Sequence, residues 1–149
     1  MSEHRAVLEW KRETPEFKYE SYDRTHTLRF DGGVAMQASS APEYLGKAEL
    51  PNPEELLAAS AASCHFLTFL AIAAKSRIVV DSYHDDPVAI LEEDASGKMA
   101  VTRIYLRPKI AFGGQAPAQE KLLAMHEKAH QACFIANSLK CEIILELQE

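Results

Sequence analysis

Three cysteines, Cys64, Cys133 and Cys141, are the residues of this chain whose side chains are best suited to chemistry. Their odd number, wide spacing and lack of any Cys-x-x-Cys pair make both a zinc ribbon and a disulfide framework poor interpretations. A free cysteine can also be a small buried hydrophobic residue, and we favour this for Cys141, which opens the last predicted strand. To react, a cysteine in a buried helix needs a nearby cation that stabilises its thiolate and access for water or substrate.

Cys64 lies in the middle of the most apolar stretch of the chain, residues 52–75, which opens with Glu54 and Glu55. The plain interpretation of both glutamates is that negative charge stabilises the N-terminus of a helix. On a helix Glu54 lies about 15 Å along the axis from Cys64, so the two cannot touch within one chain. A second, antiparallel copy of the helix in a dimer would bring them together. Neighbouring positions on a helix do not face each other, so we interpret His65 as an ordinary surface or core residue.

A second group of candidate ligands lies on the predicted helix 118–133. His126, His130 and Cys133 share one face of that helix at 100° per residue. Together with Cys64 they would make a His₂Cys₂ zinc site. Such spacing also arises by chance, in which case the two histidines flank a packed stripe. The zinc site therefore remains an alternative.

The elements that must position these side chains can be read from periodicity and capping. Asn52 is a suitable N-cap, Pro53 fits the first helical position and Glu55 completes a capping box, so a helix is predicted from here to about Lys75. Polar residues interrupt its apolar run, and we expect no membrane span. Because the helix is apolar nearly all round, it must be buried on more than one face, which favours an obligate homodimer.

Strands are predicted in runs on either side of the two helices. The glycines of "DGG" (31–33) supply the conformation that a tight hairpin needs. The fold class is α+β, with antiparallel sheets, a long central buried helix, a second helix and a single domain over 1–149. The predicted strands are 5–12, 25–30, 33–39, 78–83, 87–93, 99–112 and 141–148.

Charge and composition exclude some classes of function. The formal net charge of −6 argues against nucleic acid as a partner. The first 13 residues hold no continuous apolar run of the kind found in secretory signals. We therefore expect a cytoplasmic protein with reduced thiols.

Three segments of the sequence look familiar. "NPEELLAASAASC" (52–64) and "HQACFIANSLKCEIILE" (130–146) together resemble the OsmC/Ohr family, the osmotically inducible and organic hydroperoxide resistance peroxidases. "YDRTHTLRFDGG" (22–33) is similar to the entry strands of the OsmC-like branch. The resemblance implies an OsmC-like fold as an intertwined homodimer, with active sites at the interface.

The resemblance also implies a function and a set of site residues. Cys64 corresponds to the peroxidatic cysteine, Cys133 to the resolving cysteine, and Glu54 to the carboxylate that pairs with an arginine holding the thiolate. Arg24 is our candidate for that arginine, ahead of Arg29. The expected reaction reduces organic hydroperoxides to alcohols without metal, flavin or other cofactor, and an external dithiol such as a lipoyl group is the expected reductant.

This chain departs from the family at the residue after the resolving cysteine, where Phe134 stands in place of the usual proline. A less constrained turn at this point, together with Cys141 as a competing thiol, is expected to affect disulfide formation. The main alternative function is a redox-responsive dimeric module that binds a small hydrophobic ligand. A zinc-stabilised structural domain is the third possibility.

Overall fold

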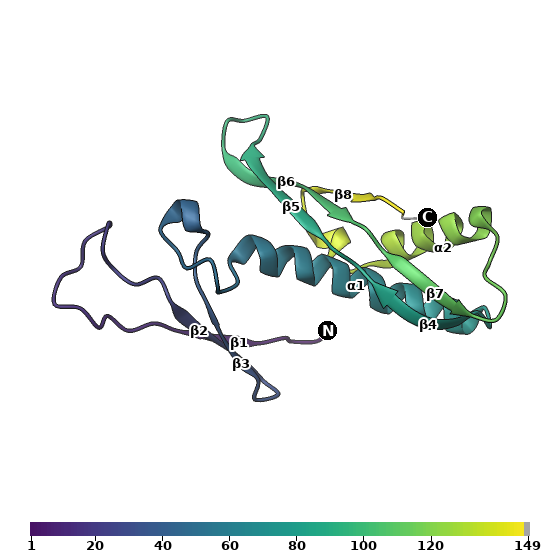
Figure 1. The fold of residues 1–149 in the computed structure, drawn as a ribbon, viewed down its shortest axis with the longest axis horizontal. Coiled ribbons are helices and arrows are strands. Elements are labelled where there is room, and N and C mark those ends of the chain that lie inside the picture. The colour runs from purple at the N-terminus through teal and green to yellow at the C-terminus, as the bar shows by residue number, and fades with distance from the viewer. Residues whose placement is uncertain (148–149) are drawn as a thin grey trace. The chain divides into compact units, whose positions relative to one another are not determined.

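The computed structural model describes residues 1–147, and these residues divide between two compact units, Met1–Leu56 and Leu57–Glu149. We describe each unit by itself. Figure 1 gives the labels of the helices and strands. The prediction of a single domain over 1–149 stays a prediction, and residue 148 of the predicted strand 141–148 lies outside the described residues.

The N-terminal unit holds an antiparallel three-stranded sheet in the order β1-β2-β3. Its strands are β1 (Ala6–Glu9), β2 (His26–Phe30) and β3 (Ala35–Ala38), followed by a short 3₁₀ helix η1 (Pro42–Tyr44). The predicted hairpin turn is confirmed, with Gly33 at φ 95°. Strand β1 is shorter than the predicted 5–12 because its pairing with β2 ends at Glu9 and Thr27.

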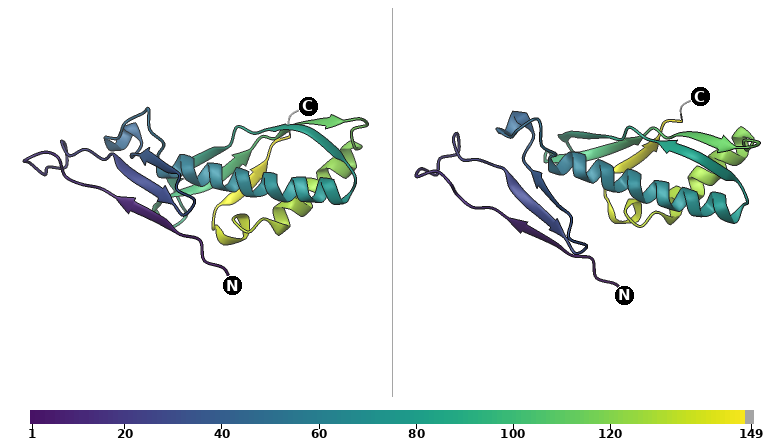
Figure 2. Two further views of the ribbon diagram at one scale, coloured as in Figure 1. Left: turned by 90° about the horizontal axis from the view of Figure 1, so that it is seen from below. Right: turned by 60° about the horizontal axis from the view of Figure 1, so that its bottom comes forward.

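The second unit contains two further sheets and both long helices. A two-stranded sheet pairs β4 (Val79–His84) with β7 (Lys109–Gly113), and a three-stranded sheet has the order β5-β6-β8. Figure 2 shows both helices on one side of these strands. The other elements are α1 (Pro53–Lys75), whose first residues belong to the N-terminal unit, β5 (Val88–Glu93), β6 (Met99–Leu106), α2 (Gln119–Ala132), the 3₁₀ helix η2 (Ala136–Ser138) and β8 (Glu142–Leu145).

The single long strand predicted over 99–112 is wrong. The chain breaks between β6 and β7 at Arg107–Pro108, where proline has no N–H to donate to a strand ladder. The Arg107 N–H donates instead to Asp85 Oδ1 at 2.6 Å. The break allows β6 to pair with β5 while β7 pairs with β4. All pairings are antiparallel as predicted except that of β6 with β8, which is parallel.

Helix α1 begins as its sequence predicts. The Glu55 N–H donates to Asn52 Oδ1 at 2.9 Å and the Asn52 N–H donates to Glu55 Oε1 at 3.1 Å, which confirms the capping box. By length and composition α1 could cross a membrane, and core helices of soluble proteins meet the same criteria. Its predicted end at Lys75 is also confirmed.

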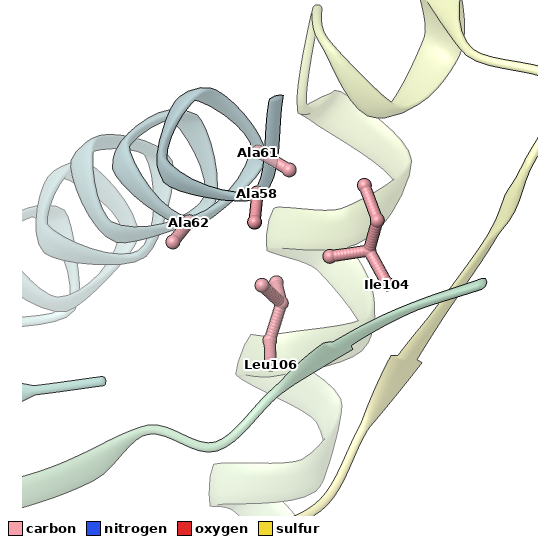
Figure 3. Packing of buried hydrophobic residues seen from close by; sticks show 5 residues of the cluster. All are labelled: Ala58, Ala61, Ala62, Ile104 and Leu106. Carbon is pink, nitrogen blue, oxygen red and sulfur yellow. The ribbon is translucent and has the colours of Figure 1, made fainter. Parts of the chain in front are cut away.

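The core of the second unit lies where α1 packs against β6 and, further along, against α2. Small residues of α1 allow close approach of the β6 side chains Ile104 and Leu106, as Figure 3 shows. Further along α1, Phe69 packs with Met125 of α2. The buried positions of α1 recur every three or four residues and form one stripe: Ala58, Ala61, Ala62, His65, Phe69 and Ala73.

Candidate active site

The structure brings Cys64 and Cys133 together. Cys64 lies in the middle of α1 and is partly exposed, whereas Cys133 ends α2 and is 1% exposed. Each thiol shifts the pKa of the other: Cys133 lowers that of Cys64, and Cys64 raises that of Cys133. They are 69 positions apart in the sequence, and the packing of α2 on α1 brings them close. Figure 2 shows the ribbons of these two helices side by side.

The two cysteines differ in how readily they ionise. Burial opposes ionisation of Cys64, but donors around it lower its pKa below the usual value: the Cys133 thiol first, then the backbone N–H groups of Ile135 and Phe134. The Thr68 hydroxyl donates to the Cys64 carbonyl oxygen at 2.9 Å. It makes the smallest contribution to lowering the Cys64 pKa. Burial first, and then the hydrogen bond to Cys64, raise the pKa of Cys133. Cys64 is therefore the thiol of the pair that ionises more readily, and Cys133 is the one that holds its proton more tightly.

Cys141 lies apart from this pair. It precedes β8, is partly buried and packs against the core cluster that includes Ile104. Burial raises its pKa. This is the environment of a structural thiol, as the sequence indicates.

A pair of buried histidines joins the two helices that carry the cysteines. His65 Nε2 and His126 Nδ1 are 3.0 Å apart, the rings lie nearly parallel with centroids 5.3 Å apart, and Phe69 stacks on His126 at 4.5 Å. Burial lowers the pKa of both imidazoles to about 4, and for His65 the nearby His126 and His130 add to the effect. Both rings are therefore neutral at neutral pH, with one nitrogen donating to the other.

This pair cannot be predicted from the sequence of either helix alone, because its two residues lie on different helices. One feature of the sequence could have indicated the pair: His65 falls in the periodic apolar stripe of α1. A buried histidine there needs a hydrogen-bond partner from another element. His126 Nε2 is also buried, and it has no hydrogen-bond partner within the described residues. In residues 1–147 no group of three or more His, Cys, Asp or Glu is arranged to hold a metal ion, so the zinc alternative is wrong.

The two charged residues expected at the site do not meet within the chain. Glu54 is partly buried in the first turn of α1, ten positions before Cys64. In the N-terminal unit, the Arg24 guanidinium donates to the carbonyl oxygens of Tyr22 at 3.0 Å and Tyr19 at 2.7 Å, and it stacks on the Tyr22 ring at 3.9 Å. Among the described residues no ion pair joins Arg24 to Glu54.

The second candidate arginine has a partner of its own. Arg29 lies on β2 and forms an ion pair with Glu9 of β1 at 3.8 Å. Within residues 1–147, neither arginine forms an ion pair with Glu54. The donors that lower the Cys64 pKa in this chain are a thiol, two backbone amides and a hydroxyl.

Comparison with known proteins adds independent evidence. The family model described as OsmC-like protein matches residues 46–148. The solved structure of an OsmC-like protein of unknown function from Vibrio cholerae is 43% identical, with a TM-score of 0.95, and covers 99% of this chain and 100% of its own. The uncharacterised protein YmaD of Bacillus subtilis is 24% identical over 119 residues, which are 78% of this chain and 79% of that protein.

Two more distant structures have names that refer to a function. An organic hydroperoxide resistance protein OsmC from Legionella pneumophila is 18% identical with a TM-score of 0.72, covering 99% of this chain and 96% of its own. The organic hydroperoxide resistance protein OhrB of Bacillus subtilis is 19% identical with a TM-score of 0.69, covering 99% and 98%. At these identities the likeness concerns the fold, which confirms the predicted α+β architecture.

Proposed function

The chain belongs to the OsmC-like protein family, and we propose that it is a thiol-dependent peroxidase that reduces organic hydroperoxides to alcohols. Cys64 is the proposed peroxidatic cysteine and Cys133 the proposed resolving cysteine. The observation that carries the proposal is the closeness of the two thiols, each of which shifts the pKa of the other: that of Cys64 is lowered and that of Cys133 is raised. A thiolate beside a protonated thiol is the arrangement that two-cysteine peroxide reduction requires.

The proposed reaction has two steps on the protein. The Cys64 thiolate attacks the distal oxygen of the hydroperoxide, an S–O bond forms, the O–O bond breaks, and the leaving alkoxide takes a proton to become the alcohol. Cys64 is thereby oxidised to a sulfenic acid. The Cys133 sulfur then attacks that sulfur, an S–S bond forms, and the displaced hydroxide leaves as water with the Cys133 proton.

The disulfide must be reduced before another turnover. An external dithiol, for which a lipoyl group is our candidate, does so by two successive thiol–disulfide exchanges. No cofactor is needed, because both electrons come from thiols. We place the reaction in the cytoplasm, where dithiols are kept reduced, and assign the protein no nucleic-acid or membrane partner.

A homodimer is part of the proposal. The face of α1 opposite its buried stripe is exposed and carries mostly small residues, with Leu67 61% exposed. Burying such a leucine is worth about 2 kcal/mol, and small neighbours allow a second helix to approach closely. In this dimer Glu54 and Arg24 of a second copy complete the site around Cys64. The exposed face consists of Ala59, Ser60, Ser63, Leu67, Ala71 and Ala74.

The dimer can be tested by changing this face. Leu67→Glu places a charge in the proposed interface and is expected to yield monomers in sedimentation velocity experiments. Leu123→Glu is the matched control, because Leu123 is 49% exposed on the other helix. A Leu67→Glu variant that sediments like the unmodified protein would disprove this interface.

The peroxidase proposal is tested by counting free thiols. Addition of one equivalent of cumene hydroperoxide to the reduced protein is expected to remove two thiols per chain rapidly. Cys64→Ser should abolish the loss, and Cys133→Ser should let Cys64 reach the sulfenic acid, which dimedone traps. Slow or absent loss in the unmodified protein would favour the alternative of a ligand-binding module.

A further inference from the structure

Helices α1 and α2 meet through an apolar contact that contains one polar pair. Phe69 of α1 packs with Met125 and Ala129 of α2 in one buried cluster. In the same contact, His65 Nε2 and His126 Nδ1 lie 3.0 Å apart, and the two residues are only 1% and 2% exposed. In the part of the chain that the structure describes, no other hydrogen bond joins these two helices.

Stability alone does not explain why two histidines are buried here. Each imidazole loses its contacts with water, and one hydrogen bond between neutral rings offsets only part of that loss. His126 Nε2 is buried as well and has no hydrogen-bond partner within the described residues, so its desolvation is not offset. Two apolar side chains of similar size would avoid both costs.

A hydrogen bond fixes the relative position of two helices more strictly than apolar packing does. Apolar attraction is not directional, and packed helices can shift by one turn between alternative arrangements. Such a shift, ~5.4 Å along the axis, would leave the facing nitrogens of His65 and His126 without partners. A buried polar pair therefore favours a single register, as one buried asparagine does in a coiled coil.

The orientation of the two rings is also restricted. They lie 5° from parallel, and Phe69 stacks on His126 with ring centroids 4.5 Å apart. Phe69 lies one turn after His65 on α1, so the same helix holds the His126 ring by stacking and by a hydrogen bond. The pair is therefore satisfied in one arrangement of α2 on α1.

The histidines are close to the two cysteines along the chain. Cys64 directly precedes His65 on α1. Cys133 follows His126 by two helical turns, which puts it on the same side of α2, about 10 Å further along the axis. A slide of α2 along α1 would move Cys133 past Cys64 by the same amount. Because the Cα separation in a disulfide varies by only about 2 Å, a shift of one turn would prevent bridging.

Packing on either side places the end of α2 at the middle of α1. Before the end of α2, Ala129 lies in the buried cluster with Phe69. After α2, Ile135 packs against the cluster that holds Ala62. These two contacts bracket the stretch of α1 that includes Cys64.

We propose that His65 and His126 are positioning residues for the thiol pair: the hydrogen bond between them fixes the register of α2 on α1 and so keeps Cys133 beside Cys64. The register is a property of the reduced protein and does not depend on any peroxide. Its consequence for turnover, delivery of Cys133 to the oxidised Cys64, rests on the proposed function.

The test measures how readily the two cysteines form a disulfide with each other. The protein is equilibrated with reduced and oxidised dithiothreitol, and the Cys64–Cys133 disulfide is quantified by mass spectrometry of its peptides. The dithiothreitol disulfide supplies the oxidising equivalents and is reduced to the dithiol in the exchange. The result is an equilibrium constant that involves no hydroperoxide.

Three variants separate register from stability. His65→Leu/His126→Leu removes the hydrogen bond and keeps the contact apolar. His65→Gln/His126→Asn offers a hydrogen bond between neutral side chains at the same place. Asn52→Ala is the control, because it removes the N-cap of α1, outside the contact with α2.

We expect the leucine pair to lower the equilibrium constant about tenfold, the size of effect that one hydrogen bond supports. The Gln/Asn pair should restore it to within about threefold of the unmodified protein, and Asn52→Ala should leave it within about twofold. A folded leucine pair with an unchanged constant would overturn the proposal. A fall of the same size in Asn52→Ala would also overturn it, because general loss of stability would then be the cause.

A second measurement decides if circular dichroism shows that the leucine pair does not fold. Nitrogen NMR of the unmodified protein should show His65 and His126 hydrogen-bonded both with reduced thiols and with the Cys64–Cys133 disulfide. A bond that is lost when the disulfide forms would overturn the proposal, because the register that it fixes would not be the one that joins the cysteines.

The proposed function fails separately. An unmodified protein whose thiols do not react with hydroperoxide, while its disulfide equilibrium responds to the histidine variants as expected, would overturn the peroxidase proposal and leave the positioning role of His65 and His126 intact.

Discussion

The buried histidine pair predicts a specific dependence of stability on pH. An imidazole of pKa about 6.5 in the unfolded chain has a pKa of about 4 in the folded protein, for both His65 and His126. Below pH 6.5 the unfolded chain therefore binds more protons, and the free energy of unfolding decreases as the pH falls through this window towards 4. Between pH 7 and pH 5 the loss is about 2 kcal/mol for each imidazole, or about 4 kcal/mol for the pair.

The assay is urea unfolding at pH 7, 6 and 5 with the protein concentration fixed, because assembly of copies would also change stability. The double variant His65→Leu/His126→Leu keeps the helix interface apolar and removes both titrating groups. Its loss of stability between pH 7 and pH 5 should be smaller than that of the unmodified protein by about 4 kcal/mol. His4→Ala, at an exposed terminal position, should leave the pH dependence unchanged.

The refuting result is equally specific. A double variant with the same pH dependence as the unmodified protein would show that the two imidazoles are not held neutral by burial. The pair would then titrate near its ordinary pKa, and the hydrogen bond between His65 and His126 would not describe the folded protein.

Three further predictions concern the folding of the chain, and urea unfolding at pH 7 measures each. Asn52→Ala removes the N-cap of α1 and should cost about 1 kcal/mol. Ile104→Ala empties a fully buried site in the β6 core and should cost roughly 2–5 kcal/mol, and a smaller loss would mean that the core collapses around the cavity. Gly46→Ala should prevent the N-terminal unit from folding normally, because the new Cβ would lie 1.6 Å from the Ser40 carbonyl oxygen, whereas Gly32→Ala meets nothing within 4 Å and should be tolerated.

Local signals in the sequence were sufficient to predict the elements whose ends are set by neighbouring residues. The cap of α1 is encoded within four residues, 52–55, and the hairpin after β2 in the glycines of residues 31–33, so both were predicted correctly. The strand predicted over 99–112 has alternating residues throughout, but Pro108 has no N–H for a strand ladder, and the Arg107 N–H donates to Asp85, 22 positions away. Periodicity alone cannot reveal a contact of that kind.

The candidate site divides in the same way. The resemblance identified Cys64 and Cys133 as a pair, and their contact in the structure depends on the packing of α2 against α1. The histidine pair was missed because same-face analysis joined His126 to its neighbours on α2, whereas its actual partner is His65 on α1. A residue that bonds across two helices has no signature in either helix alone.

The distribution of donors explains why one cysteine rather than the other should be the nucleophile. Burial raises the pKa of both thiols, that of the partly exposed Cys64 as well as that of the buried Cys133. The Cys133 thiol and the backbone N–H groups of Ile135 and Phe134 lower the pKa of Cys64, whereas the Cys64 thiol raises that of Cys133 against the N–H groups of Ala136 and Ile135, which lower it. The asymmetry therefore arises chiefly from the contact between the two thiols, because the Ile135 N–H acts on both sulfurs. In the proposed reaction a peroxide meets the sulfur that ionises more readily, and the proton that completes the second step comes from Cys133.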